Sequence, residues 1–228
     1  MATLTPQEWF DLLNVRFTQV TRPQWQDGRI RPDMSACSRE LQPRNRLLDT
    51  LWSYYVGDPP LPHIAAEYQD VFRDVMRKAR SNYAPMSVAA MLDRMELQAI
   101  STQVDKDLNG DDLATQIMDE SGFSATFKDL LGYLFAMGEA YAMVVPGQPT
   151  PTVHAIDPRR CVGVPDRNNP VRLAAALVKE YDPVTKEQMA HLFLPGEKWT
   201  MSFDGMRWIR ESDIPEVVED IDGLGGIP

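Results

Sequence analysis

The sequence has few of the residues from which metal centres and disulfide frameworks are built. Its 228 residues include two cysteines, Cys37 and Cys161, and three histidines. The cysteines lie far apart, with no Cys-x-x-Cys pair and no neighbouring histidine. The sequence therefore indicates neither a disulfide framework nor a zinc site, and two free thiols fit a reducing cytoplasm.

Basic residues and long apolar runs are also scarce. The chain has 23 Lys and Arg against 33 Asp and Glu, which gives a formal charge of −10. Non-specific binding to nucleic acid relies on basic side chains that neutralise phosphates, so this balance argues against it while leaving room for a local basic patch. No stretch approaches the length of a membrane helix, and the N-terminus lacks the pattern of a signal peptide. We therefore expect neither membrane insertion nor secretion.

The common catalytic motifs are absent as well. The sequence contains no nucleophile elbow, P-loop or dinucleotide-binding glycine motif. His63, His154 and His191 fall in different predicted elements, and none has the spacing of a metal pair. A lone strand histidine such as His154 is more often half-buried and structural than catalytic. The sequence thus predicts a protein that is not an enzyme, with no catalytic, cofactor-binding or metal-binding residues.

What the sequence does contain is a helical first half. Thr5, Pro6 and Glu8 form a capping box that begins a helix, and an apolar stripe follows it: Trp9, Leu12, Leu13, Phe17 and Val20. Residues 21–43 are punctuated by prolines and read as an extended, mildly basic arm or loop. Further helices are predicted over 44–56, about 64–80, 86–95, 113–118 and 124–135, with Gly57 and Gly138 as helix ends. The Met-rich stripe of 86–95 is interpreted as core packing, with a binding groove as the alternative.

The second half alternates between strands and turns. The predicted strands are 140–145, 152–156, 160–164, 173–181, 188–194, 198–203 and 206–209, and their separators are turn-like: DRNNP, DPVTK, LPGE and FDGM. The pattern predicts an α+β fold in which a helical N-terminal half precedes an antiparallel, hairpin-rich β region. We divide the chain into an N-terminal helix and arm (1–43), a helical region (44–138) and a β region (139–228).

Two charged stretches are candidate sites. In DKDLNGDD, Asp105, Asp107, Asn109 and Gly110 match positions one, three, five and six of a calcium loop, but Gln116 replaces the bidentate Glu at position twelve. The favoured interpretation is a turn with acids at a helix N-terminus, such as Asp112. In the other stretch, 157–160 (DPRR) follows a predicted strand. It has the charges for anion binding, but a charged hairpin turn is the more common use of such residues.

Four stretches together resemble a known family. They are RNRLLDTLWSYYVGDPPLP, VMRKARSNYAPMSVAAMLDRMEL, FKDLLGYLFAMGEAYAMVV and VHAIDPRRCVGVPD. Their shared features are a helix ending in Tyr55-Val56-Gly57, an Asn82-Tyr83 step before a helix with Asp93-Arg94, and the segment Gly138-Glu139-Ala140-Tyr141. In order and spacing, over about 47–222, the chain resembles the first half of portal proteins of tailed bacteriophages with Gram-positive hosts.

The resemblance implies a structural role in the virion. Portal proteins form a ring, usually a dodecamer, at one capsid vertex. The packaging motor (terminase) and the head-tail connector dock there, and double-stranded DNA passes through without tight binding. The implied partners are other portal subunits and capsid proteins, and the implied location is the capsid vertex, with the host cytoplasm during assembly. The chain ends before the family's clip, stem and crown, so we expect it to represent the wing portion, with motor docking carried by regions outside it.

Two interpretations remain open at the level of sequence. The first is a portal wing whose N-terminal helix packs between subunits of the ring and is loosely held in an isolated chain. The second is an ion-regulated or enzymatic globular domain built around the acidic loop Asp105 to Asp112 and the Met-rich helices.

Overall fold

The structure, a computed structural model, describes residues 4–17, 24–26, 29–31, 44–59, 81–97, 112–147, 151–166 and 172–218, together with isolated positions. The chain forms two compact units. The first, here called the sheet unit, comprises Met1–Asn45 and Ile156–Pro228, and the second, the helical unit, comprises Arg46–Ala155. Helices and antiparallel strands are both abundant, with helices in the N-terminal half and strands after them, so the predicted α+β class is confirmed.

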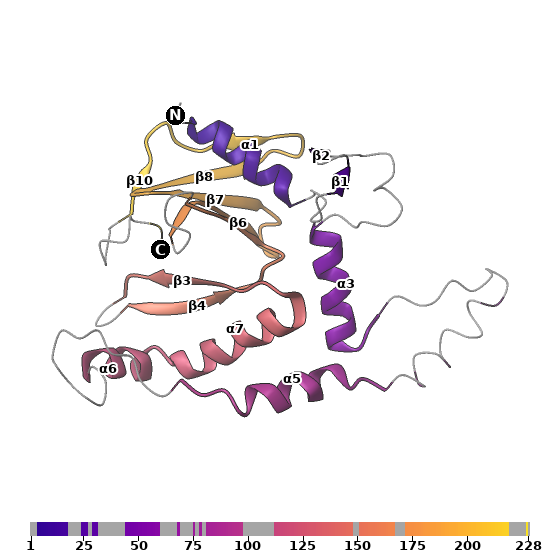
Figure 1. Ribbon diagram of the computed structural model, residues 1–228. Coiled ribbons are helices and arrows are strands. Elements are labelled where there is room, and N and C mark those ends of the chain that lie inside the picture. Colours follow the sequence, from indigo (N-terminus) through magenta and orange to yellow (C-terminus); the bar gives the residue numbers. More distant parts are fainter. Residues whose placement is uncertain are drawn as a thin grey trace. The chain divides into compact units, whose positions relative to one another are not determined.

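An antiparallel sheet forms the body of the sheet unit. Its strand order is β10-β8-β7-β6-β5, with β9 also paired to β8 (Figure 1). The strands are β5 (Cys161–Pro165), β6 (Leu173–Tyr181), β7 (Gln188–Leu194), β8 (Glu197–Phe203), β9 (Trp208–Arg210) and β10 (Glu216–Val217). Consecutive strands β5 to β9 pair as neighbours, as expected for elements joined by short turns. The sequence predicted all of these strands except β10, within one or two residues.

The core of the sheet unit lies between the sheet and α1 (Pro6–Arg16), which crosses the strands in Figure 1. Alternate strand residues point to one face and meet the helix, as the two-residue period of a strand requires. Ala176, Val178 and Phe193, on the other face, are buried as well. The cluster comprises Phe10, Leu13, Phe17, Val162, Ala175, Leu177, Ala190, Leu192, Leu194, Trp199 and Met201. The capping box of α1 forms as predicted, because the Thr5 hydroxyl accepts from the Glu8 amide and the Glu8 carboxylate accepts from the Thr5 amide.

Two expectations for this helix are corrected. The buried stripe runs through Phe10, Leu13 and Phe17, whereas Leu12 is 43% exposed. The cap at Thr5 determines where the helix begins. Which face of the helix is buried depends on how it packs on the sheet, and the local pattern of apolar residues does not predict that. The helix also packs on its own chain, so the idea of an inter-subunit helix loosely held in isolation is wrong.

Two short pairings were missed. Within the predicted extended arm, β1 (Gln24–Gln26) and β2 (Arg29–Arg31) pair as antiparallel strands, and Asp-Gly stands between them in the sequence. Asp-Gly is a frequent hairpin turn, so the signal was present in the sequence. Strand β10 pairs with β8 through Glu216 and Val217. A two-residue strand with both side chains exposed has no periodicity from which to predict it.

The helical unit contains α5 (Ala84–Leu92), α6 (Asp112–Glu120), α7 (Phe123–Met137) and the strand β3 (Tyr141–Val145). It also contains α3 (Arg44–Val56) from Arg46 onward and β4 (Thr152–Ile156), the partner of β3, as far as Ala155, whereas Arg44 and Asn45 belong to the sheet unit. Helices α5 and α6 both contact α7. Gly138, at φ +81°, ends α7 as predicted, since a left-handed cap favours glycine. Most of the predicted helix 64–80 lies outside the described residues.

The Met-rich stripe of α5 is not core. Met86 is 65% exposed, Met91 43% and Met95 42%, whereas Val88 is buried. On α7, Leu131 and Met137 are buried, but Leu134 and Phe135 are exposed at 43% and 37%. Apolar periodicity marks a helix reliably, but it does not show how much of the apolar face a neighbouring element will cover.

Candidate functional site

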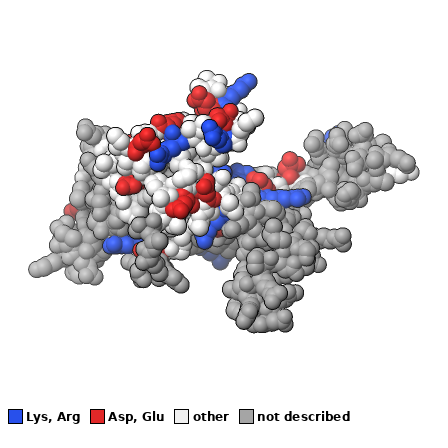
Figure 2. Space-filling model, turned by 90° about the horizontal axis from the view of Figure 1, so that it is seen from above, with Lys and Arg blue, Asp and Glu red and all other residues white. Residues whose placement is uncertain are grey.

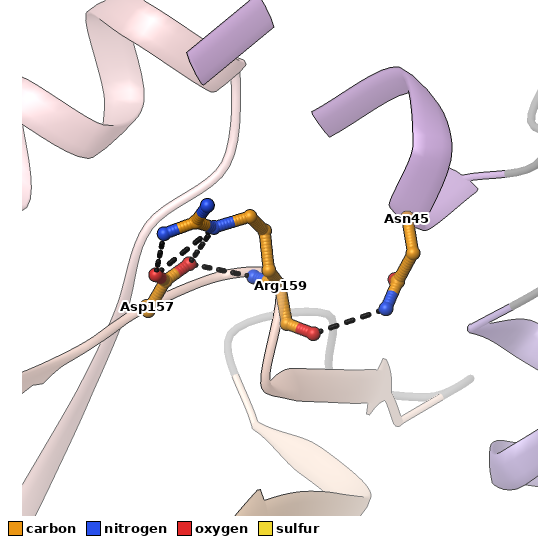
Figure 3. A network of polar contacts seen from close by, with 3 residues as sticks. All are labelled: Asn45, Asp157 and Arg159. Carbon is orange, nitrogen blue, oxygen red and sulfur yellow. Dashed lines mark hydrogen bonds and ion pairs between the residues drawn. The ribbon is translucent and has the colours of Figure 1, made fainter. Parts of the chain in front are cut away.

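The charged turn Asp157 to Arg160 closes on itself. The Asp157 carboxylate accepts the backbone N–H of Arg159 at 2.9 Å and its Nε–H at 3.0 Å, and it also pairs with the guanidinium (Figure 3). Burial alone would raise the pKa of Asp157, but the hydrogen bonds from Arg159 and the charges of Arg159 and Arg160 outweigh it, so the pKa is lowered. Arg159 is thereby engaged within its own turn.

The start of α3 holds this turn in place. Arg44, only 7% exposed, donates from one guanidinium nitrogen to the carbonyls of Pro158 and Cys161, each at 3.0 Å. Asn45 donates from Nδ2 to the carbonyl of Arg159 at 3.1 Å (Figure 3). These contacts join residues more than a hundred positions apart and satisfy buried carbonyls. They support the structural interpretation of the DPRR turn, with Arg160 as the exception.

Arg160 lies beside a shallow hollow in the sheet unit. The hollow has a volume of about 220 Å³ and is lined by Arg160, Lys179, Glu180, Tyr181, Gln188 and Trp208. The backbone N–H of Lys179 donates to the carbonyl of Arg160 at 2.8 Å, which continues the β5–β6 register by one position beyond Cys161 and Val178. Lys179 and Arg160 are therefore cross-strand neighbours.

The Lys179 ammonium sits among uncharged groups. Its Nζ donates to Asn14 Oδ1 at 2.6 Å and lies 4.3 Å from the Phe17 ring centroid and 5.6 Å from that of Trp208. Burial lowers the pKa of Lys179. No carboxylate of the described residues lies within ion-pair distance of it. The ring contacts stabilise the charged form, because aromatic faces attract cations.

Of the residues that line this hollow, only Arg160 belonged to a candidate site predicted from the sequence. A signal was available, because Lys179 lies two residues after Leu177 and therefore on the same, helix-covered face of β6. A lysine at an inward-facing position is a departure from the pattern of half-buried strands.

The histidines have separate environments. His191, on β7, lies 3.2 Å from Thr200 Oγ1 and 3.6 Å from Glu180 Oε2. Burial, followed by the charge of Lys198, lowers the pKa of His191 despite the opposing effect of Glu180. His154 lies on an exposed position of β4, with its ring 3.1 Å from Thr152 Oγ1, so the half-buried placement expected for it is wrong. His63 lies outside the described residues.

The acidic loop is described only at its end. Residues 105–111 are outside the described ranges, and Asp112 lies in the first turn of α6, where an acid is favourable. Gln116 lies within α6 and donates to Glu120 at 2.7 Å. In the parts of the chain that the structure describes, no three His, Cys, Asp or Glu residues are grouped so as to hold a metal ion. Whether the loop binds calcium stays a prediction.

Two of the recurring motifs contact each other. Gly57, at φ +83°, follows the end of α3, and Asn82 donates from Nδ2 to the Tyr55 carbonyl at 2.8 Å. A Cβ at position 57 would lie 2.7 Å from the same Asn82 nitrogen, so glycine is required both for its conformation and for space. Asn82 also accepts from the amide of Ala84 at the start of α5. One asparagine thus joins the end of α3 to the start of α5.

The third motif shapes the passage from α7 to β3. Gly138 provides the left-handed cap, and the Tyr141 hydroxyl donates to the Glu139 carboxylate at 3.3 Å.

The charge distribution, the helix lengths and the comparisons with known proteins narrow the range of possible functions little further. On the face shown in Figure 2, the described basic and acidic side chains are intermingled, and neither sign forms a continuous patch. Among the described helices, none combines the length and the hydropathy needed to cross a bilayer. No protein-family model and no curated protein matches the chain.

Proposed function

We propose that this chain is a structural subunit of a bacteriophage portal, corresponding to the wing portion of the ring through which double-stranded DNA is packaged and ejected. The observation that carries the proposal is the contact between Asn82 and the Tyr55-Val56-Gly57 turn. The resemblance rests on short motifs in a fixed order. Two of these motifs are in contact: Asn82 donates to the carbonyl of Tyr55, 27 residues away, and lies close to Gly57. The contact gives these two motifs one structural role, which is to join the end of α3 to the start of α5.

Exposed apolar side chains on the helical unit favour a role in assembly. Met86, Met91 and Tyr83 are 65%, 43% and 67% exposed. Large exposed apolar groups near one another are typical of surfaces that bind other proteins. In a closed ring the same patch on every subunit meets a complementary patch on its neighbour. The proposed occupant of the α5 surface is therefore a neighbouring copy of the chain.

The acidic balance also fits the proposal. A formal charge of −10 disfavours tight retention of phosphates, which suits a ring through which DNA moves. The alternative, an ion-regulated or enzymatic domain, gains no support from a described contact, since the loop on which it rests lies outside the described residues. Its distinguishing test is calcium, which should leave the thermal unfolding midpoint unchanged if the portal assignment holds.

Direct imaging tests the proposal. The full product of the gene that encodes this chain should be purified and examined by electron microscopy, where we expect closed rings around a central channel. Met86→Asp should prevent ring formation, because it places a charge in the proposed contact. Val184→Asp is the matched control, since Val184 is 87% exposed in the β6–β7 turn of the sheet unit. A monodisperse monomer, or equal behaviour of the two variants, would contradict the proposal.

A further inference from the structure

The hollow beside Trp208 presents an unusual pair of charges. Arg160, the turn residue before β5, lies opposite Lys179 of β6, whose backbone N–H donates to the Arg160 carbonyl one position beyond the Cys161–Val178 pair. Side chains in such positions lie on the same face of the sheet, and like charges directly opposite are destabilising. A protein of net charge −10 has many acidic side chains with which to relieve this repulsion. Among the described residues, however, neither Arg160 nor Lys179 takes part in an ion pair.

The nearest acidic residues are directed elsewhere. Glu180 lines the hollow, but it follows Lys179 in the strand, so its side chain projects from the opposite face, where the carboxylate lies 3.6 Å from His191. Asp157, whose pKa responds to Arg160, is already bonded to Arg159 in the turn. Among the described residues, the positive side of the hollow therefore has no carboxylate of its own, and Arg160 shares the charge of Asp157 with Arg159.

The ammonium also retains unused donors. A lysine has three N–H donors, and the described contact of Lys179 with Asn14 Oδ1 accounts for one of them. The Phe17 and Trp208 rings attract the charge without accepting a conventional hydrogen bond. A half-buried ammonium with free donors, next to an exposed guanidinium, has the arrangement that binds an oxyanion through charge-assisted hydrogen bonds.

Aromatic groups complete the lining. Trp208 packs against Phe10 and Phe203, with ring centroids 5.7 and 5.2 Å apart, so its position is fixed by the core. Tyr181, half exposed at the end of β6, stands on the same side of that strand as Lys179. A fixed indole beside two cations fits a ligand in which an anionic group is attached to a planar or apolar body.

We propose that the hollow lined by Arg160, Lys179 and Trp208 is a binding site for an oxyanion, carboxylate or phosphate, carried on a planar or apolar group. Lys179 and Arg160 donate to the anion, and Trp208 and Tyr181 contact the attached body. The site belongs to the sheet unit alone, and it is independent of the portal assignment.

Four probes test the site on the intact chain: acetate, benzoate, inorganic phosphate and phenyl phosphate, added at constant ionic strength with chloride as the reference salt. The readout is the indole N–H resonance of Trp208, assigned with a Trp208→Phe variant. We expect saturable shifts, with benzoate and phenyl phosphate binding more tightly than acetate and phosphate. A preference for benzoate identifies a carboxylate ligand and a preference for phenyl phosphate identifies a phosphate, and either result supports the site.

Three variants identify the donors. Lys179→Met keeps the aliphatic stem and should weaken binding about tenfold or more, because hydrogen bonds to charged groups are individually strong. Arg160→Gln, on an exposed side chain, should weaken it by about threefold, since exposed charge interactions are small. Lys128→Met, an exposed lysine of α7, makes the same change of charge and should leave binding unchanged.

Arg160→Gln keeps the test decisive if Lys179→Met does not fold. The proposal is overturned if no probe gives a saturable shift at Trp208, or if Lys128→Met weakens binding as much as Arg160→Gln does.

Discussion

The two units of the chain use their apolar residues differently. In the sheet unit, α1 and four strands bury a continuous cluster, with Leu13, Leu177 and Leu192 fully inaccessible. In the helical unit, the buried apolar side chains among the described residues are Leu48, Val88, Leu131 and Met137. The same unit exposes Met86, Met91, Met95, Tyr54, Tyr83, Leu134 and Phe135. The sheet unit therefore has the larger core among the described residues, and its own exposed apolar side chains, such as Val184, Met206 and Val217, lie outside that core.

This difference indicates which unit contributes more to the free energy of unfolding of the isolated chain. Hydrophobic stabilisation follows the apolar area removed from water, so the sheet unit gains more from its own packing. Exposed apolar area gains stability only when something covers it. The comparison therefore predicts that substitutions in the sheet unit act on the isolated chain, whereas those on the exposed face of α5 act mainly on assembly.

The largest expected effect is on the packing of α1. Leu13→Ala should lower the free energy of unfolding by about 2–5 kcal/mol, as expected for a fully buried leucine. Leu12→Ala, at the neighbouring exposed position, should lower it by about 0.5 kcal/mol or less, in the range of surface substitutions. Denaturant unfolding of both variants measures the difference. Equal effects would show that the helix does not present Leu13 to the sheet.

Helix α7 offers the same contrast within the helical unit. Leu131→Ala should cost about 2–3 kcal/mol, toward the lower end for a buried leucine, because this unit has less surrounding core. Phe135→Ala should cost less, about 1–2 kcal/mol, because Phe135 is 37% exposed and more than a third of its area stays in water. Denaturant midpoints distinguish the two. A larger loss for Phe135→Ala would mean that its ring has a partner essential to the fold.

Replacing glycines by alanine tests the contact between Asn82 and the turn at Gly57. Gly57→Ala and Gly122→Ala both place a side chain at positive φ, at +83° and +63°, and each should cost about 1–2 kcal/mol from backbone strain. A Cβ at 57 additionally meets Asn82, whereas one at 122 has open space. Thermal unfolding should therefore show the greater loss for Gly57→Ala. If the two losses are the same, Asn82 yields without cost and the close approach has no energetic role.

The smallest effect concerns pH. Because the pKa of Asp157 is lower in the folded than in the unfolded state, the unfolded chain binds its proton more readily. The stabilising contribution is present above the unfolded pKa of about 4 and is lost as pH falls through the folded pKa. Asp157→Asn should therefore reduce the loss of stability on acidification below about pH 4, measured by unfolding at a series of pH values. An unchanged acid dependence would mean that the turn does not hold this carboxylate ionised.

Local signals in the sequence were sufficient for most of the architecture. The capping box at Thr5, the glycine ends at Gly57 and Gly138, and the turn sequences on either side of β6 and β7 each depend on neighbours in the chain. Such features predict elements and their limits because their causes are local. The bounds of α3, β4, β6 and β7 match the sequence prediction.

Features that depend on distant residues were not predictable in the same way. The inward face of α1 is selected by the sheet, so Phe10 is buried where Leu12 was expected. The Met residues of α5 carry the periodicity of a core helix, yet their exposure depends on what other elements cover. The hollow needs Arg160, Lys179 and Trp208 from three strands or turns brought together by strand pairing. Arg160 alone was identified, as part of a charged turn.

Hydrogen exchange on the isolated chain tests the comparison most directly. Amide exchange should be followed in α1 (Pro6–Arg16) and in α5 (Ala84–Leu92) under the same conditions. Because α1 is part of the sheet core and α5 has a largely exposed apolar face, α1 should exchange much more slowly. In the proposed ring, α5 should become protected while the exchange of α1 stays unchanged. Exchange of α1 in the isolated chain as fast as that of α5 would contradict the account.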